Sequence, residues 1–327
     1  MTQPLVAIII VNFNGKEDTL RCLESLRQDR YVNKQIIVVD NGSANDSVAV
    51  IRQAYPDVTV VETGKNLGFG GGNNVGIRHA VAAEADYVYL LNNDTTSEPD
   101  ALSELVKAAR EDPSFGILAP VMHYMAEPEK IWFGGATLDP ITLEALHDNT
   151  SPPERGDPLR EIPWATGCAM LIPAKVISEL GGFDERFFLY SEDVDLSLRA
   201  KAAGHRIGLV PAARIFHKVG ASAKGSPMSS YHALRGKLLL QRFHGGTCRR
   251  RNSFRIALGA LRENLRDLRH GRATPRRVFG PSLAAIRDEL LRRLRPEVGT
   301  EHKEAVKSAM LRSGPSSPSG QATPRNP

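Results

Sequence analysis

The sequence contains little cysteine, no long apolar run and no basic leader. Its three cysteines, Cys22, Cys168 and Cys248, are scattered without the spacing of a metal site. They imply no disulfide framework and fit a reducing cytosol. No stretch of about 18 apolar residues occurs, so the sequence predicts no membrane-spanning helix. The first residues, MTQPLVAIIIVNF, enter a strand pattern without a preceding basic region, so we expect no signal peptide.

Charge is divided unevenly along the chain. Residues 231–327 hold 21 Lys or Arg against 7 Asp or Glu, a net charge of +14. Residues 1–230 hold the other 21 basic residues against 30 acidic ones, a net charge of −9. A mildly acidic body with a basic tail indicates that the two parts have different tasks.

Apolar strands alternate with amphipathic helices in the first part of the chain. Strands are predicted at 6–11, 35–39, 58–62 and 87–91, and helices at 16–28, 47–55 and 74–84. This alternation predicts an α/β fold of βαβ units, with a mostly parallel sheet flanked by helices. Further along we expect a helix at 101–110 and strands at 116–120, 164–172, 207–210 and 214–216. Residues 148–163 are predicted to form an ordered loop or a mobile lid.

Polar residues follow two of the apolar runs. Asn92, Asn93 and Asp94 end the run that starts at Tyr87, where open α/β sheets bind ligands. A carboxylate there suits Mg²⁺ or Mn²⁺, which share oxygen ligands with substrate phosphates. Asp40 ends another strand, where a carboxylate can accept a hydrogen bond from a base N–H or from a ribose hydroxyl. Ordinary strand-end turns use the same residue types, so both interpretations stand.

A glycine-rich stretch between Asn66 and Gly76 precedes the third predicted helix. Its five glycines allow backbone N–H groups and the helix dipole to face an anion closely. The pattern is neither a Walker loop nor a dinucleotide fingerprint. The alternative is a flexible surface loop.

An acidic helix start is predicted at Ser191, with Glu192 and Asp193 in the first turn. Ser is a natural N-cap, and the helix dipole favours anions there. Such a start keeps a carboxylate ionised, as a general base must be, although helix capping alone explains the acids equally well. Asp195 and Arg199 are predicted to pair on the exposed face of this helix.

Two further residues allow two interpretations each. Trp164 is either a stacking platform for a sugar or a core residue, the commoner role of Trp. His217 follows a short strand, and a lone His in that place is usually structural.

Seven short motifs occur in an order that resembles inverting family-2 glycosyltransferases of the GT-A fold, in particular their bacterial rhamnosyltransferase-like branch. The motifs are Val11-Asn-Phe-Asn14, Val38-Val-Asp-Asn-Gly-Ser43, Asn66-Leu-Gly68, Leu91-Asn-Asn-Asp94, Thr166-Gly167, Ser191-Glu-Asp193 and Phe216-His217. The resemblance covers residues 5–245.

The resemblance implies roles for these residues. The donor site would comprise Asn12, Asn14, Asp40, Asn66, Gly68, Gly72, Asn73, Asn92 and Asn93, with Asp40 on the base. Asn92 replaces the first acid of the family's Asp-x-Asp motif, which leaves Asp94 as the main metal ligand, assisted by His217. Asp193, or Glu192 beside it, would be the catalytic base. Trp164 and Gly167 would line the acceptor site.

The implied reaction transfers a sugar with inversion, a deoxyhexose such as rhamnose, from a dTDP- or UDP-linked donor. Its acceptor would be a hydroxyl of a glycan or lipid-linked molecule in cell-envelope polysaccharide synthesis, and Mg²⁺ or Mn²⁺ the cofactor. A sugar-nucleotide nucleotidyltransferase is an alternative, but its glycine-rich loop normally lies at the N-terminus. A basic nucleic-acid-binding module is another, but the tail has few aromatics for base stacking, so we expect no nucleic acid partner.

The chain is predicted to have three parts. Residues 1–228 form the catalytic domain, with a donor half at 1–120 and an acceptor half at 121–228. Residues 229–297 form a basic helical extension, and 298–327, rich in Ser and Pro, are predicted to be disordered. Basic amphipathic helices indicate either a membrane-surface element or a cap packed on the catalytic domain. We expect a cytoplasmic protein bound peripherally to the anionic inner face of the cell membrane, with a homodimer as a candidate assembly.

Overall fold

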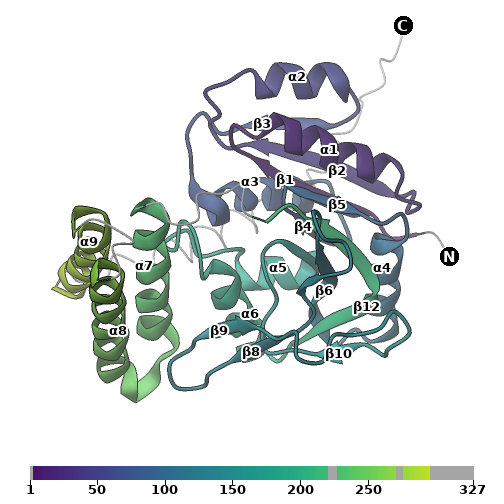
Figure 1. Ribbon diagram of the computed structural model, residues 1–327. Coiled ribbons are helices and arrows are strands. Elements are labelled where there is room, and N and C mark those ends of the chain that lie inside the picture. Colours follow the sequence, from purple (N-terminus) through teal and green to yellow (C-terminus); the bar gives the residue numbers. More distant parts are fainter. Residues whose placement is uncertain (1–2, 220–226, 270–274, 295–327) are drawn as a thin grey trace, which may run out of the picture. The chain divides into compact units, whose positions relative to one another are not determined.

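The computed structural model describes residues 3–219, 227–269 and 275–294, which form a mixed α/β fold (Figure 1). The strands are β1 (Val6–Asn12), β2 (Lys34–Asp40), β3 (Thr59–Glu62), β4 (Tyr87–Leu91), β5 (Thr95–Ser97), β6 (Phe115–Tyr124), β7 (Ile131–Phe133), β8 (Ala136–Leu138), β9 (Ala145–His147), β10 (Arg160–Glu161), β11 (Ala169–Pro173) and β12 (Arg206–His217). The helices are α1 (Lys16–Arg27), α2 (Ser47–Ala54), α3 (Gly68–Ala82), α4 (Ala101–Glu111), α5 (Ala174–Leu180), α6 (Glu192–Ala202), α7 (Pro227–His244), α8 (Arg249–Arg269) and α9 (Pro275–Leu294). None of the helices described is long and apolar enough to cross a membrane. The tail predicted to be disordered, 298–327, lies outside the described residues.

The main sheet has the strand order β10-β12-β6-β11-β4-β1-β2-β3. β1 runs parallel to both β2 and β4, and β2 runs parallel to β3, which confirms the predicted βαβ units. Beyond β4 the sheet is mixed, because β11 runs antiparallel to β4 and to β6. The register of β1 and β2 sets Asn12 opposite Asp40. The carboxyl ends of β1, β2 and β4 therefore lie at one edge of the sheet.

The central strand β1 is covered on both faces. Residues 6–10 are fully buried, as expected for the continuous apolar run of a central parallel strand. Helix α3 packs on β1 at Gly76, where a Cβ atom would lie 2.4 Å from Ile9 Cγ2. Glycine at this position lets the helix approach the sheet closely.

Three predicted elements need correction. The glycines expected in a loop belong to α3, which starts at Gly68 rather than near residue 74. β11 starts at Ala169, so Trp164 lies in the irregular segment before it. The two short strands predicted after residue 206 are one strand, β12, because a bulge between Val210 and Arg214 lets pairing with β6 continue.

Helix α7 packs on the α/β part of the chain, and α7, α8 and α9 lie side by side (Figure 1). Leu239 and Leu240 of α7 belong to the main hydrophobic core. Arg235 Nη1 donates to Phe187 O at 3.2 Å. This is the cap arrangement that the sequence offered as one interpretation of the basic extension. The domain boundaries themselves stay predictions.

The turn before α6 has an unusual backbone. Phe188, Tyr190 and Ser191 have φ angles of +63°, +67° and +70°, a region that costs a non-glycine residue about 1–2 kcal/mol. Two glycines allow close contacts that hold this turn. A Cβ atom at Gly68 would lie 2.3 Å from Phe188 O, and one at Gly236 of α7 would lie 2.6 Å from Tyr190 O.

We expect Gly236→Ala to destabilise the protein by about 1–3 kcal/mol, because the added methyl group would collide with the Tyr190 carbonyl. Urea unfolding measures the change. Gly259→Ala on α8 is the matched control, since a Cβ atom there meets nothing within 4 Å. It should stabilise by about 0.5–1 kcal/mol through helix propensity. Equal effects of the two substitutions would show that the contact between α7 and the turn contributes nothing.

Candidate functional site

Hydrogen bonds between side chains tie together the carboxyl ends of β1, β2 and β4. Asn12 Nδ2 donates to Asp40 Oδ1 at 2.8 Å, and Asn12 Oδ1 accepts from Thr19 Oγ1 at 3.0 Å. Asn93 Nδ2 in turn donates to Thr19 Oγ1 at 3.1 Å. Thr19 is fully buried on α1 and was not singled out in the sequence. In the sequence, Thr19 could have been recognised as a hydroxyl residue on the apolar side of the predicted helix 16–28.

The other asparagines at this edge shape the loops. Asn14 Oδ1 accepts from the backbone N–H of Ala44 at 2.8 Å. Asn66 Oδ1 accepts from the N–H of Gly68 at 2.8 Å and from Asn41 Nδ2 at 3.2 Å. These bonds fix the loops that follow β1 and β3, next to the start of α3.

Gly72 and Asn73 lie inside α3 rather than in a loop. A Cβ atom at Gly72 would lie 3.0 Å from Val11 Cγ1, so this glycine packs the helix on β1. Asn73 Nδ2 donates to Phe69 O at 3.0 Å, one turn earlier in the helix. Roles of these two residues in nucleotide binding stay predictions.

Asp94 and His217 meet where β4 and β12 end. His217 Nε2 lies 3.2 Å from Asp94 Oδ1, and the two side chains are 10% and 12% exposed. His217 Nδ1 is buried and has no hydrogen-bond partner in the described part of the chain. β12 places His217 here through its pairing with Thr95 of β5, which directly follows Asp94.

A divalent cation fits this pair of side chains. Mg²⁺ is typically held by one or two carboxylates together with water and substrate phosphates. The described residues contain no group of three or more His, Cys, Asp or Glu that could hold a metal. A cation at Asp94 and His217 would therefore need further ligands from substrate and water, in keeping with the uncharged Asn92 in the first motif position.

Glu192 and Asp193 are neighbouring carboxyl groups at the start of α6. Asp193 Oδ2 accepts from the N–H of Gly167 at 3.0 Å, and Oδ1 accepts from the N–H of Val194 at 2.8 Å. Burial raises the pKa of Asp193 above its usual value, and the two N–H groups oppose that rise. Glu192 is 5% exposed, and its Oε2 has no partner among the residues described. Burial, and then the charge of Asp193, raises the pKa of Glu192 well above its usual range.

The start of α6 differs from the prediction in two respects. Ser191 occupies the N-cap position but its side chain makes no capping hydrogen bond. Asp195 does accept from Arg199 Nε at 2.8 Å, yet it is buried rather than on an exposed face. The reason is α7, whose His244 Nε2 lies 2.8 Å from Asp195 Oδ1 and covers this side of the helix.

Segment 166–168 lies between the end of β4 and the two acids at the start of α6, Glu192 and Asp193. Cys168 O accepts from the backbone N–H of Asn92 at 2.8 Å, while the neighbouring Gly167 donates to Asp193. A Cβ atom at Gly167 would lie 2.9 Å from the Phe69 ring of α3. The segment therefore brings the end of β4, the start of α3 and the start of α6 together.

Trp164 packs in the core. It is 4% exposed, and its Nε1 donates to Thr137 O at 2.9 Å. This corresponds to the commoner role considered from the sequence and leaves the indole little surface for stacking on a sugar.

Trp132 and His147 also belong to this region, and the sequence analysis missed them. The Trp132 ring lies edge-on to the rings of His217 and His147, with centroids 4.4 and 4.7 Å apart. His147 Nδ1 lies 2.9 Å from Trp132 O and donates to it, which leaves Nε2 as an acceptor. Burial lowers the pKa of His147, and the charge of Asp193 opposes that change. Both are single residues in a stretch without regular periodicity, so no motif marked them.

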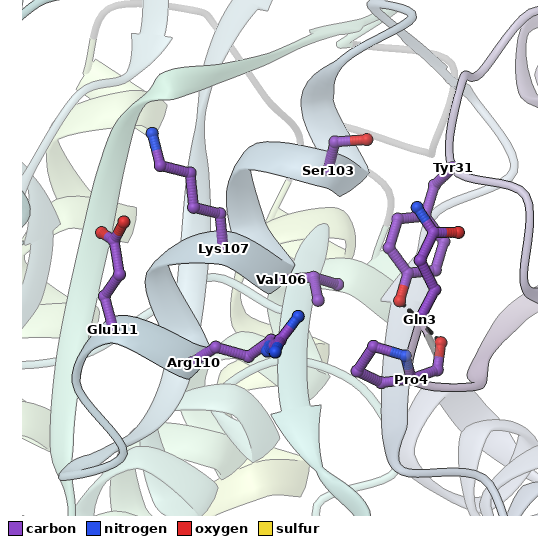
Figure 2. A pocket seen from close by; sticks show the side chains of 8 residues that line it. All are labelled: Gln3, Pro4, Tyr31, Ser103, Val106, Lys107, Arg110 and Glu111. Atoms are coloured by element: carbon purple, nitrogen blue, oxygen red, sulfur yellow. Dashed lines mark hydrogen bonds between the residues drawn. The ribbon is translucent and has the colours of Figure 1, made fainter. Parts of the chain in front are cut away.

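A separate hollow of about 410 Å³ lies elsewhere, lined by residues that include Tyr31, Lys107 and Arg110 (Figure 2). Tyr31 precedes β2, and Gln3 and Pro4 of the same hollow precede β1. The hollow is therefore at the amino ends of the strands, away from the carboxyl edge that carries the polar motifs.

The family model for glycosyl transferase family 2 matches residues 7–180, more than half of the chain. The chain belongs to glycosyl transferase family 2. Curated relatives of this family member include an N-acetylglucosaminyl-diphospho-decaprenol L-rhamnosyltransferase of Mycobacterium tuberculosis, 28% identical, with 69% of this chain and 80% of the relative covered. The rhamnosyltransferase WbbL of Escherichia coli is also 28% identical, with 65% and 83% covered.

Solved structures show the same fold. GalNAc-T7, solved with UDP, GalNAc and Mn²⁺, superposes with a TM-score of 0.55 at 17% identity, over 65% of this chain and 43% of that one. TarS of S. aureus in complex with UDP-GlcNAc gives 0.50 at 16% identity, over 73% and 67%. These structures establish the GT-A fold. The family model and the curated relatives establish a glycosyltransferase, and neither the nucleotidyltransferase nor the nucleic-acid-binding alternative is favoured.

We expect Glu192→Gln to stabilise the protein relative to wild type by an amount that grows with pH. The folded-state pKa of Glu192 is raised, so wild type loses stability as pH rises from the unfolded-state pKa through the folded-state pKa, and Gln does not titrate. Urea unfolding at about pH 5 and about pH 8 measures the difference. Glu263→Gln, at an exposed position on α8, is the control. A pH-independent difference between Glu192→Gln and wild type would contradict the raised pKa.

Proposed function

We propose that this glycosyltransferase transfers a deoxyhexose such as rhamnose, with inversion, from a dTDP- or UDP-linked donor to a hydroxyl of a glycan or lipid-linked acceptor in cell-envelope polysaccharide synthesis. The observation that carries the proposal is the placement of Asp193 beside Gly167, one residue from the Cys168 carbonyl that binds the end of β4. One short segment thereby connects the proposed base to Asn92, two residues before the proposed metal ligand Asp94. The rhamnosyltransferase names of the relatives support the choice of sugar.

The donor would lie along the carboxyl edge of β1, β2 and β4. Asp40 is the proposed partner of the nucleotide base. Both of its oxygens already accept one N–H, from Asn12 and from Ser43. A carboxylate has about four acceptor sites, so capacity for a base N–H is left.

Transfer needs one base and one displacement. Asp193 removes the proton of the acceptor hydroxyl, whose oxygen attacks the anomeric carbon on the side opposite the diphosphate. The bond from that carbon to the diphosphate oxygen breaks, and its electron pair leaves with the nucleoside diphosphate. The anomeric centre is inverted, and no covalent enzyme intermediate is formed.

The Asp94 and His217 pair is the proposed holder of Mg²⁺ or Mn²⁺. When bound, such an ion offsets the negative charge of the leaving diphosphate. His147, neutral and with Nε2 as an acceptor, lies near enough to Asp193 to feel its charge. We propose that it helps to position the acceptor.

The enzyme is also proposed to act at the cytoplasmic face of a membrane, as a peripheral protein and with a homodimer as a candidate assembly. The relative from Mycobacterium tuberculosis is named for a decaprenol-linked acceptor, and such lipids reside in membranes. The basic residues of 231–327 support contact with an anionic surface.

The proposed reaction is tested with a panel of dTDP- and UDP-linked sugars. Release of nucleoside diphosphate is measured with each donor, and mass spectrometry identifies the product formed with added polyprenyl-diphosphate-linked N-acetylglucosamine. A dTDP- or UDP-deoxyhexose should give the highest turnover. Turnover with hexoses alone would refute the choice of sugar.

Asp193→Asn should lower the rate of transfer by about 10²–10⁴, because the base is removed while its hydrogen-bonding shape is kept. Donor affinity, measured by calorimetry, should stay near that of wild type. In wild type, kcat/KM should fall as pH drops through the pKa of Asp193, which burial raises above its ordinary value. Near-normal turnover in the variant would remove Asp193 from the mechanism and direct attention to Glu192.

Activity should be lost in excess EDTA and restored by Mg²⁺ or Mn²⁺. With one carboxylate and one imidazole as ligands, affinity for free metal should be weak and should rise in the presence of the nucleotide sugar. Titration of Mn²⁺ with and without donor, followed by its paramagnetic resonance signal, measures this. Asp94→Asn should abolish the effect of the donor on metal binding. Full activity in EDTA would exclude the metal-dependent mechanism.

A further inference from the structure

We propose that the outward face of α8 binds an anionic lipid surface. The proposal deepens the proposed function in one respect, since a lipid-linked acceptor would be met at that surface. It rests on the way α8 is packed, on the side chains it leaves exposed and on the charges beside them.

Helix α8 packs on α7 and α9 through one face. Asn252 and Ser253 are buried, and Asn252 Nδ2 donates to Ile141 O at 2.6 Å. Ile256 and Ala260 pack against the small core that α7 and α9 form. The leucines of α8 do not belong to this inward face.

The apolar residues of α8 form a separate stripe. We call this set the α8 stripe: Phe254, Leu258, Leu261, Leu265 and Leu268. At about 100° per residue these positions occupy an arc of about 80°, turned away from the inward face. Phe254 is 69% exposed and Leu265 is 47% exposed. Leu258, Leu261 and Leu268 are half-buried. Among the described residues, Phe254 and Leu265 are therefore the members of the stripe that are open to solvent.

A row of arginines borders the stripe on one side. We call this set the α8 arginine row: Arg251, Arg255, Arg262, Arg266 and Arg269, all exposed. The row occupies an adjoining arc of about 60°. None of the five forms a salt bridge within the described parts of the chain. Glu263, an exposed acid of α8, lies outside both arcs.

An apolar stripe beside a row of cations is the composition of a helix that lies in a membrane interface. The arginines would meet lipid phosphates while the stripe enters the acyl boundary. A second copy of the chain is a poorer occupant, because a two-fold contact that pairs this face with antiparallel helices would bring two arginine rows together. Nucleic acid is poorer still, because leucines offer no surface for base stacking.

The test uses the full chain, since Leu239 and Leu240 of α7 belong to the main core and a truncation before α7 would expose it. Co-sedimentation is measured with vesicles of phosphatidylglycerol and phosphatidylcholine, and with phosphatidylcholine alone. Wild type should bind the anionic vesicles at low salt and lose binding as salt is raised. Phe254→Ser/Leu265→Ser and Arg255→Glu/Arg262→Glu should each weaken binding at least about tenfold.

Matched controls distinguish the contribution of the α8 face from general effects of lost apolar surface or altered net charge. Val32→Ser changes an apolar residue that is 82% exposed in the loop before β2. Arg78→Glu/Lys175→Glu makes the same change in net charge at exposed positions on α3 and α5. Both controls should bind vesicles as wild type does. Thermal unfolding of every variant verifies that the fold is intact.

Two results would overturn the proposal: no binding of wild type to anionic vesicles, or equal binding by the Phe254→Ser/Leu265→Ser variant. If that variant instead turned a dimer into a monomer in sedimentation velocity, a second copy would be the occupant. Release of nucleoside diphosphate without vesicles should be unchanged in the α8 variants. Asp193→Asn should bind vesicles normally, so failure of the reaction and failure of the lipid contact give different results.

Discussion

Two adjacent carboxyl groups stand at the start of α6, with Glu192 buried and Asp193 half-buried. They cannot both ionise without a large cost, and this constraint governs the candidate site. Asp193 has two backbone N–H groups on its oxygens, whereas Glu192 Oε2 has no partner in the described chain. Burial therefore raises the pKa of Glu192 well above its usual range, while the two N–H groups oppose the rise in the pKa of Asp193. Because one of those N–H groups belongs to Gly167, the position of Asp193, the proposed base, is tied to the segment that binds the end of β4.

The support for this arrangement comes from distant parts of the chain. The turn before α6 has three non-glycine residues with positive φ angles. Such a backbone conformation is retained only where contacts with the surrounding structure hold it in place. Gly68 on one side and Gly236 on the other let α3 and α7 approach it. His244 of α7 also holds Asp195 inside the protein. The helices after β12 therefore pack in two ways: α7 contributes to the main core and holds the start of α6, and α8 has a separate apolar and cationic face.

Much of the fold was predictable because its signals are local. The apolar run of β1 predicted a strand buried on both faces, and residues 6–10 are fully buried. Asn12, Asp40 and Asn93 were predicted at strand ends, and hydrogen bonds through Thr19 connect them. The glycines of α3 misled the prediction because their conformational freedom suggests a loop, whereas here their lack of a side chain brings the helix against Ile9 and Val11.

The sequence by itself determined the βαβ order, the family motifs and the division of charge, since each of these depends on residues close together along the chain. Tertiary structure decided which of two adjacent acids can carry charge, because burial and the Gly167 N–H reach α6 from another element. It also placed Trp132 against both His217 and His147. The sequence did not indicate this, because neither Trp132 nor His147 belongs to a periodic pattern or a motif. Finally, the tertiary structure decided which face of α8 is buried. The sequence of α8 offers both a leucine face and a face of smaller side chains, and the contacts with α7 and α9 select the second for burial.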